Sequence, residues 1–534
     1  MSETPRPSRS GGPRGAGGQR GAGGQRGRQD RRDQRPERPG ERPGERPGQR
    51  RGVRQDRFTA VDDARRVAYA VLRAVEEEDA YANLVLPRML RQQRLSGRDA
   101  AFATELAYGV LRGRGSYDAL LASVSDRPLA ELDPGVLDVL RLGAHQVLAT
   151  RVPDHAAVAT SVALARRELG SGPSGLVNAV LRQLAGRELG PWLEEVAPDA
   201  ATDPVGHLAV RWSHPAWVVR SLREALVAHG RDAGELADLL AADNAPAAVA
   251  LAALPGLAGP ADLLSDDRAL TVRPGRWSPT AAVLEHGDPG RVPAVREGRA
   301  RVQDEGSQLV AHVLAAAGVE PRAGAGAGAE GERWLDLCAG PGGKAALLAA
   351  HAAGRGASLT AVEVAPHRAD LVRQALAAVP GEVQVRVGDG REVGRDEPAA
   401  FDRVLVDAPC TGLGALRRRP EARWRRSPAD LGALGPLQRD LLGSALDAVR
   451  PGGVVAYATC SPVLAETRLV VDDALKAAAK RGVQVERLDT PAVLASVLGG
   501  QELPGAAAGK GAVQLWPHAH GTDAMHVALL RRTS

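Results

Sequence analysis

The chain has 534 residues, enough for about three domains of ordinary size and at least one large hydrophobic core. Hydrophobic residues make up 44% and charged residues 25%, as in soluble globular proteins, and we expect neither a membrane span nor a signal peptide. The three cysteines are too few for a disulfide framework, and without a Cys-x-x-Cys pair or a histidine cluster we expect no metal. The composition therefore predicts a cytoplasmic protein.

The positive charge is concentrated at the N-terminus. Residues 1–57 hold 16 arginines against 7 acidic residues, whereas the whole chain has a net charge of only +5. This segment also repeats Gly-Ala-Gly-Gly-Gln-Arg and Glu-Arg-Pro-Gly. Because it has few apolar residues, we expect a disordered Arg/Gly/Pro-rich tail, which either holds a polyanion or acts as a solubilising extension.

Residues 58–190 carry a helical pattern. Apolar residues recur at three- and four-residue spacing in four segments, namely 64–72, 101–111, 136–148 and 176–184. Asp133-Pro134 is typical of a helix start, with the aspartate as cap and the proline in the first turn. The pattern predicts an all-helical domain of about five to seven helices.

Residues 191–300 are less informative. A helical region begins at Trp212 and extends to about Ala241, and the apolar runs Val249–Leu254 and Ala269–Val272 predict short strands broken by proline and glycine. We expect a small α+β domain that binds RNA or links its neighbours.

Residues 301–534 alternate between strand and helix patterns. Strands are expected at 334–337, 359–362, 383–387, 404–406 and 454–457, with a Gly/Ala-rich surface loop at 323–331. This alternation predicts a doubly wound parallel sheet of the Rossmann-like α/β type. The chain is therefore expected to be multidomain, with an all-α N-terminal domain and an α/β C-terminal domain.

A glycine-rich turn follows the first of these strands, where backbone N–H groups at a helix N-terminus can meet a ligand. The turn comprises Cys338, Ala339, Gly340, Pro341, Gly342, Gly343 and Lys344. Ala345 stands where a P-loop needs Ser or Thr and where the dinucleotide fingerprint has its last glycine.

Acidic residues follow the next three strands, and they are Glu363, Asp389 and Asp407. Glu363 lies where a carboxylate can accept both ribose hydroxyls, and Asp389 lies where it can contact the adenine or its surroundings. S-adenosylmethionine suits this set because it carries no phosphate that three acids would repel.

Two cysteines follow the fourth and fifth strands. Cys410 lies in Asp407-Ala408-Pro409-Cys410 and Cys460 in Tyr457-Ala458-Thr459-Cys460, with a helical pattern at 437–449 between them. A right-handed strand–helix–strand crossover makes the two strands parallel and brings both thiols to the sheet edge where ligands bind. We therefore interpret the pair as a reaction centre.

A thiol pair beside a methyl donor favours methylation of carbon 5 of cytosine, which is barely nucleophilic. A thiolate that adds to carbon 6 activates carbon 5, and a second thiol can help product release. The base must be unpaired or flipped for a thiol to reach it. An arginine-rich segment, 417–426, borders this edge, and the residues expected to contact the RNA are Lys344, Asp407, Arg418 and Arg423.

Two sets of motifs resemble known families. The first, at 99–112, 141–146 and 177–182, resembles the NusB-type RNA-binding helical domain. The second resembles the Sun/Fmu (RsmB) family of 16S rRNA (cytosine-5) methyltransferases, and its motifs lie at 303–308, 338–344, 407–414, 459–461 and 516–523. Together they cover residues 58–534.

The resemblance implies that Cys460 is the nucleophile and that Cys410 helps product release. It also implies S-adenosylmethionine contacts from residues 338–344 and from Glu363, Asp389 and Asp407. Its substrate would be 16S rRNA, and we expect a monomer that acts before the subunit is fully assembled.

The sequence departs little from the family pattern. Glu363 stands where many relatives have Asp, and His526 stands where an aromatic residue is usual. Two alternatives remain open, namely a tRNA cytosine-C5 methyltransferase and a non-catalytic RNA-binding or antitermination-type factor. Intact Cys410 and Cys460 speak against the second.

Overall fold

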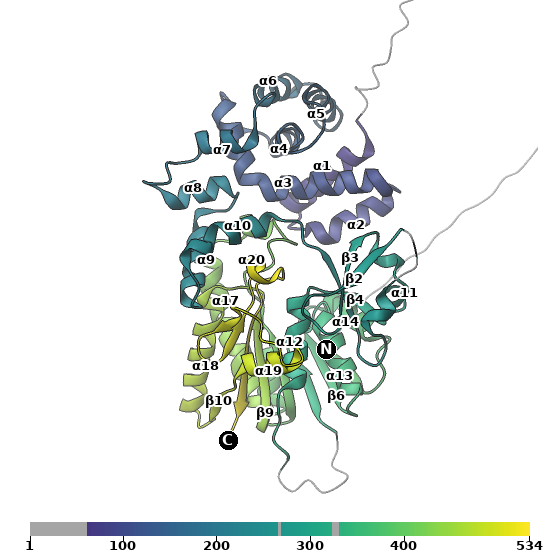
Figure 1. Cartoon of the computed structure of the whole chain (residues 1–534), viewed down its shortest axis with the longest axis vertical. Coiled ribbons are helices and arrows are strands. Elements are labelled where there is room, and N and C mark those ends of the chain that lie inside the picture. Colours follow the sequence, from purple (N-terminus) through teal and green to yellow (C-terminus); the bar gives the residue numbers. More distant parts are fainter. Residues whose placement is uncertain (1–60, 265–266, 268, 323–330) are drawn as a thin grey trace, which may run out of the picture. The chain divides into compact units, whose positions relative to one another are not determined.

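The structure is a computed structural model that describes residues 61–264, 267, 269–322 and 331–534 (Figure 1). The predicted N-terminal tail and nearly all of the predicted Gly/Ala loop lie outside these residues. In the described ranges, no helix has the length and apolar character needed to cross a membrane. The same ranges contain no group of three or more His, Cys, Asp or Glu side chains that could hold a metal ion.

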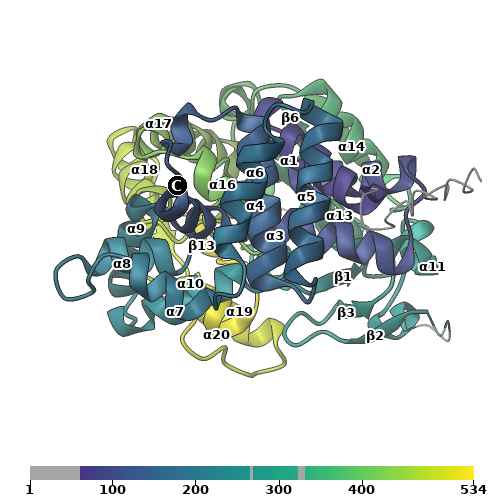
Figure 2. The ribbon, with the colours of Figure 1, turned by 90° about the horizontal axis from the view of Figure 1, so that it is seen from above.

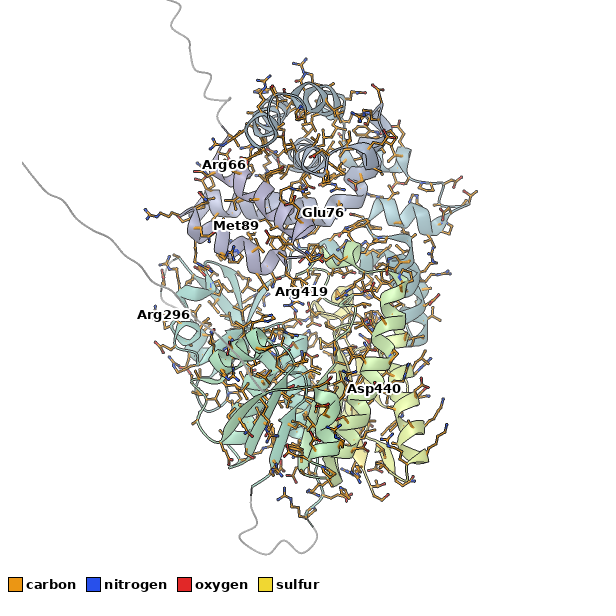
Figure 3. The ribbon with its side chains drawn as sticks, turned by 180° about the vertical axis from the view of Figure 1, so that it is seen from behind. Arg66, Glu76, Met89, Arg296, Arg419 and Asp440 are labelled. Atoms are coloured by element: carbon orange, nitrogen blue, oxygen red, sulfur yellow. The ribbon has the colours of Figure 1, made fainter. Side chains whose placement is uncertain are left out.

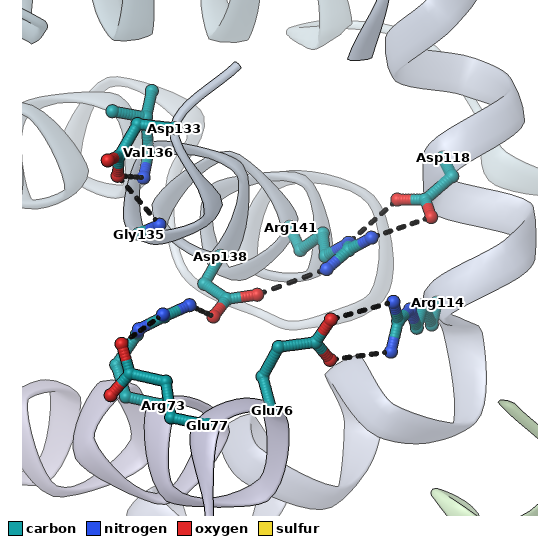
Figure 4. A network of polar contacts seen from close by, with 10 residues as sticks. All are labelled: Arg73, Glu76, Glu77, Arg114, Asp118, Asp133, Gly135, Val136, Asp138 and Arg141. Carbon is teal, nitrogen blue, oxygen red and sulfur yellow. Dashed lines mark hydrogen bonds and ion pairs between the residues drawn. The ribbon is translucent and has the colours of Figure 1, made fainter. Parts of the chain in front are cut away.

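The N-terminal segment is helical, as its periodicity predicts. Its helices are α1 (Asp63–Glu77), α2 (Ala82–Gln92), α3 (Gly97–Val124), α4 (Pro134–Ala149), α5 (Asp154–Leu169) and α6 (Ser174–Leu184). Figure 2 shows α4, α5 and α6 side by side. The Asp133 carboxylate caps α4 by accepting the N–H groups of Gly135 and Val136 at 2.8 and 3.2 Å, which confirms the predicted helix start (Figure 4).

A buried ionic network connects three of these helices (Figure 4). Asp138 of α4 accepts hydrogen bonds from Arg73 of α1 at 2.7 Å and from Arg141 at 3.1 Å. Arg141 in turn donates to both carboxylate oxygens of Asp118 in α3, at 2.7 and 2.8 Å. Burial raises the pKa of Asp138 although both arginines oppose it. The network fixes α1, α3 and α4 against one another.

The middle segment is an α+β arrangement, as expected. Its elements are α7 (Leu189–Val196), α8 (Pro204–Arg211), α9 (Ala216–Ala228), α10 (Leu236–Asn244), β1 (Val249–Ala253), β2 (Thr271–Pro274), β3 (Ala281–His286), α11 (Pro293–Arg296) and β4 (Ala300–Val302). The sheet is antiparallel with the order β2-β3-β1-β4. The two predicted strands correspond to β1 and β2, while β3 and β4 were not predicted.

The middle segment shares its cores with the C-terminal segment. Val218 and Leu222 of α9 lie in one apolar cluster with Leu413 and Trp516. Ala252 of β1 lies in the cluster that covers one face of the large sheet. Because the two segments share apolar clusters, the domain boundary that was placed at residue 300 remains a prediction.

The C-terminal segment forms the large sheet. Its helices are α12 (Glu305–Ala316), α13 (Gly343–Ala353), α14 (Pro366–Leu376), α15 (Val393–Asp396), α16 (Ala422–Arg425), α17 (Pro428–Ala448), α18 (Arg468–Lys480), α19 (Thr490–Val497) and α20 (Pro517–His520). Its strands are β5 (Arg333–Asp336), β6 (Ser358–Glu363), β7 (Val383–Val387), β8 (Phe401–Asp407), β9 (Val449–Thr459), β10 (Val485–Arg487), β11 (Ala507–Ala508), β12 (Ala512–Gln514) and β13 (His526–Arg532).

The large sheet has the order β11-β12-β13-β9-β8-β5-β6-β7, with β10 paired to β13. The five strands from β9 to β7 are parallel, as predicted. The sheet continues beyond these five strands, where β13 pairs antiparallel with β9, and β12 and β10 pair antiparallel with β13. The sheet is therefore mixed.

Residues of the central strands alternate between two buried faces. Val404 and Val406 of β8 pack in the cluster that includes α17 and α18, whereas Leu405 packs in the cluster that includes α12 and α13. A strand that is covered on both faces needs apolar residues at consecutive positions, which explains the unbroken apolar run from Val404 to Val406. The covered faces leave the carboxyl ends of the parallel strands as the place for a ligand.

Candidate active site

The two predicted thiols meet at the carboxyl ends of β8 and β9. These strands are parallel, with Asp407 opposite Ala458, so that Cys410 and Cys460 follow neighbouring strand ends. Their sulfur atoms lie 3.5 Å apart, and both side chains are partly exposed. The prediction that the thiols lie together at this edge is confirmed.

A buried carboxylate holds the loop that carries Cys410. Glu466 accepts the backbone N–H of Thr411 at 2.7 Å and the Thr411 hydroxyl at 2.5 Å. The Gln438 amide donates to the carbonyl of Pro409 at 2.8 Å. The sequence analysis did not single out Glu466 or Gln438. The only sequence signal for Glu466 was its position as an acidic residue directly after the apolar residues 462–465, which follow the second thiol.

Lys344 links the glycine-rich turn to the thiols. Its ammonium donates to a carboxylate oxygen of Asp407 at 2.9 Å. Burial alone would lower the pKa of Lys344, but the charge of Asp407 and the hydrogen bond to it outweigh burial and raise this pKa. An ammonium ion is therefore maintained beside the thiol pair.

The two thiols have different acidities. The hydrogen bond with Cys410 lowers the pKa of Cys460, and the positive charge of Lys344 acts in the same direction. The same hydrogen bond, together with burial, raises the pKa of Cys410. The thiolate is the nucleophilic form of cysteine, and the positive charge of Lys344 favours this form at Cys460.

The glycine-rich turn lies between β5 and α13. Gly342 has φ +105°, and a Cβ there would overlap the side chain of Ala375 and come within 3.1 Å of the Val372 Cα. A Cβ on Gly340 would collide with the Glu363 carboxylate. Gly342 thus requires glycine, which brings the turn close to α14, and the absence of a Cβ at Gly340 leaves room for the Glu363 carboxylate at the end of β6.

Glu363 is buried at the end of β6. Its carboxylate accepts the N–H of Gly340 at 3.0 Å and that of Ala365 at 3.1 Å, and it pairs with Arg368 at 3.3 Å. Oε2, which has only the Gly340 N–H as a hydrogen-bond donor, keeps a lone pair for a further donor such as a ribose hydroxyl. Asp389, the second predicted acid, is partly exposed and is paired with Arg391, which lowers the pKa of Asp389.

Asp336 is a buried acid at this edge that sequence reasoning did not single out. One oxygen accepts the N–H of Cys338 at 3.4 Å, and the other has no hydrogen-bond partner. Burial, reinforced by the negative charge of Asp407, raises the pKa of Asp336 to about 7. An unpaired buried acceptor beside a glycine turn fits a bound group that supplies a donor, as the amino group or hydroxyls of S-adenosylmethionine would.

The structure corrects the interpretation of Arg423 as an RNA contact. Its side chain is fully buried, and its guanidinium donates to the Ser213 carbonyl at 3.0 Å, to the Asn244 amide oxygen at 2.7 Å and to the Asp243 carbonyl at 3.2 Å. A charge with this many internal acceptors is part of the core. Arg418 is 35% exposed and is paired with Asp523.

Other residues of the segment 417–426 contact the helical domain. The buried Glu421 accepts the N–H of Ala82 at 3.1 Å, and Arg425 donates to the Val75 carbonyl at 2.8 Å. The guanidinium of Arg419, labelled in Figure 3, lies 4.9 Å from the centre of the Tyr81 ring. Much of the arginine-rich segment therefore packs against α1 and α2.

Comparisons with known proteins give consistent results along the chain. Residues 326–531 match the family described as 16S rRNA methyltransferase RsmB/F, and residues 62–186 match the NusB family. A Mycobacterium tuberculosis (strain H37Rv) protein that is named as a methyltransferase is 52% identical over 480 residues, which are 90% of this chain and 98% of the relative. The ribosomal RNA small subunit methyltransferase B of Salmonella newport is 32% identical over 458 residues, or 83% of this chain and 95% of the relative.

A solved structure extends this likeness to the fold. The crystal structure of PH0851 aligns with a TM-score of 0.69 and 20% identity, over 88% of this chain and 99% of that chain. The two matched families, and relatives that align over most of their length, show that the chain is an RNA methyltransferase that carries a NusB domain and belongs to the RsmB/F family.

Proposed function

We propose that this protein methylates carbon 5 of a cytosine in small-subunit (16S) ribosomal RNA, with Cys460 as nucleophile. The observation that carries the proposal is the 3.5 Å contact between the Cys410 and Cys460 sulfur atoms at neighbouring parallel strand ends. A methyltransferase that acts on an amino group or on ribose has no need of paired thiols. The enzyme would act as a cytoplasmic monomer before the subunit is fully assembled.

S-adenosylmethionine would supply the methyl group as a sulfonium. The turn 338–344 would surround its amino acid part, Glu363 would accept the ribose hydroxyls, and Asp389 would lie near the adenine. The glycine positions, the free lone pair on Glu363 Oε2 and the unpaired Asp336 oxygen support this assignment. Asp407 would complete the set beside the reacting base.

The two thiols would have different roles in the reaction. The Cys460 thiolate adds to carbon 6, which forms an S–C6 bond and makes carbon 5 able to take the methyl group. Loss of the carbon 5 proton to water then breaks the S–C6 bond and releases Cys460 as the thiolate, and Cys410, 3.5 Å from Cys460, is near enough to help this release. Lys344 would keep Cys460 ionised, and Asp407 would accept a hydrogen bond from the cytosine amino group. Arg418 would contact a neighbouring phosphate.

Trapping of the adduct tests these roles. Cys410→Ala with unmodified 16S rRNA and S-adenosylmethionine should give a protein–RNA band that survives denaturing electrophoresis, because the adduct forms but is not resolved. Cys460→Ala and the double variant should give none. A band from Cys460→Ala alone would reverse the roles, and no band from either single variant would contradict the covalent route.

The substrate needs a separate test. Bisulfite sequencing of RNA from a strain without this gene should show the loss of one methylated cytosine in small-subunit rRNA. Loss in tRNA instead would support the tRNA enzyme. No loss in either RNA would support a non-catalytic RNA-binding factor.

A further inference from the structure

The thiol pair is close enough for a second kind of chemistry. The Cys410 and Cys460 sulfur atoms are 3.5 Å apart, whereas sulfur atoms in a disulfide are about 2.05 Å apart. An approach of roughly 1.5 Å would therefore join them. Both side chains are partly exposed at the sheet edge, so a small oxidant can reach them.

We propose that Cys410 and Cys460 are a redox-sensitive modification site, at which a hydroperoxide converts the two thiols into a reversible disulfide. The bond would be intramolecular and would occupy both sulfur atoms of the active site. Formation of the disulfide does not depend on the proposed function. Only the expected loss of methyl transfer depends on it.

The reaction balances in two steps. The Cys460 thiolate attacks the peroxide, which cleaves the O–O bond, gives a sulfenic acid and releases an alcohol, or water when the oxidant is hydrogen peroxide, once the leaving oxygen is protonated. The Cys410 thiol then attacks the Cys460 sulfur, the S–OH bond breaks, and water leaves. The two sulfur atoms together lose two electrons, which the peroxide accepts. A dithiol reductant reverses the change.

The local chemistry assigns the order of these steps. The hydrogen bond with Cys410 lowers the pKa of Cys460, so Cys460 is the thiol that reacts first. Cys410 lies in contact and captures the sulfenic acid before further oxidation to the irreversible sulfinic acid.

The third cysteine provides an internal comparison. Cys338 lies in the glycine-rich turn, where burial and the neighbouring Asp336 and Asp407 raise the pKa of its thiol. A thiol with a raised pKa reacts slowly with peroxide, because the thiolate is the reactive form. The pair should therefore be oxidised while Cys338 stays reduced.

The test is a thiol count on the whole purified protein. The reduced protein has three cysteines, and after stoichiometric hydrogen peroxide a thiol reagent under denaturing conditions should find one. Proteolysis without reductant should give a single cross-linked species, joining the peptides of Cys410 and Cys460. Dithiothreitol should restore three thiols and any methyl transfer activity.

Two variants separate the outcomes. Cys338→Ser should fall from two thiols to none, with the same linked peptides. Cys410→Ser should form no link and should instead show a dimedone-reactive Cys460. A cross-link that involves Cys338, or three thiols remaining after peroxide, would overturn the proposal. Since mass spectrometry detects the bond directly, a protein that forms it without methylating cytosine would contradict the proposed function alone.

Discussion

Replacement of Arg423 by methionine separates two interpretations of the arginine-rich segment. In the structure its guanidinium is fully buried and donates to Ser213, Asn244 and Asp243. Methionine keeps the apolar stem but removes the donors. If Arg423 were an RNA contact, the substitution would leave the folded protein intact and weaken RNA binding. If it is a core residue, the substitution destabilises the fold.

The magnitude follows from the acceptors left behind. A buried acceptor without a partner costs about 1–3 kcal/mol, and Arg423→Met leaves up to three of them. Part of this cost is offset, because the buried arginine is itself poorly solvated and burial lowers the pKa of Arg423 to about 10. Burial also raises the pKa of Asp243 to about 7, so this carboxyl can stay protonated once the arginine is removed. We expect a net loss of about 3 kcal/mol in the free energy of unfolding.

Thermal unfolding followed by near-ultraviolet circular dichroism measures this loss. For a domain of ordinary size, about 3 kcal/mol lowers Tm by roughly 6–12 °C. Arg439→Met is a matched control, since the Arg439 side chain is 41% exposed and lies 3.8 Å from its partner Asp473. This control should change stability by less than about 0.5 kcal/mol. An Arg423→Met protein with normal Tm and weakened RNA binding would refute the reasoning.

Two further substitutions test the site. The charge of Lys344 lowers the pKa of Cys460, and Lys344→Met also leaves the Asp407 carboxylate unopposed, so the variant should have a higher Cys460 pKa. Alkylation of Cys460 by iodoacetamide should therefore shift to higher pH, which peptide mass spectrometry can follow. An unchanged pH profile would contradict this electrostatic link. Gly342→Ala, at φ +105°, should cost about 1–3 kcal/mol and weaken S-adenosylmethionine binding in calorimetry. Gly354→Ala at the end of the same helix, at φ −63°, should bind normally, and equal affinities in the two variants would show that the turn does not hold the cofactor.

Much of the catalytic edge could be predicted from local patterns. Cys410 and Cys460 each follow an apolar run typical of a buried strand, and the right-handed crossover makes such strands parallel. The glycines around Gly342 predict a turn, and Gly342 indeed has a positive φ, which few residues other than glycine adopt. These inferences depend on the order of residues along short segments and on general rules of chain connection.

Arg423 shows why the rest could not be predicted. An arginine in a charged run is normally solvated, and its burial depends on acceptors from Ser213 and Asn244, about two hundred residues earlier in the chain. The antiparallel pairing of β13 likewise depends on the path of the chain after β9. Local residue patterns were enough to predict the two thiols, the glycine turn and the parallel core of the sheet. Which charges are buried could be known only from the folded chain, because burial and pairing depend on partners that folding brings from distant segments.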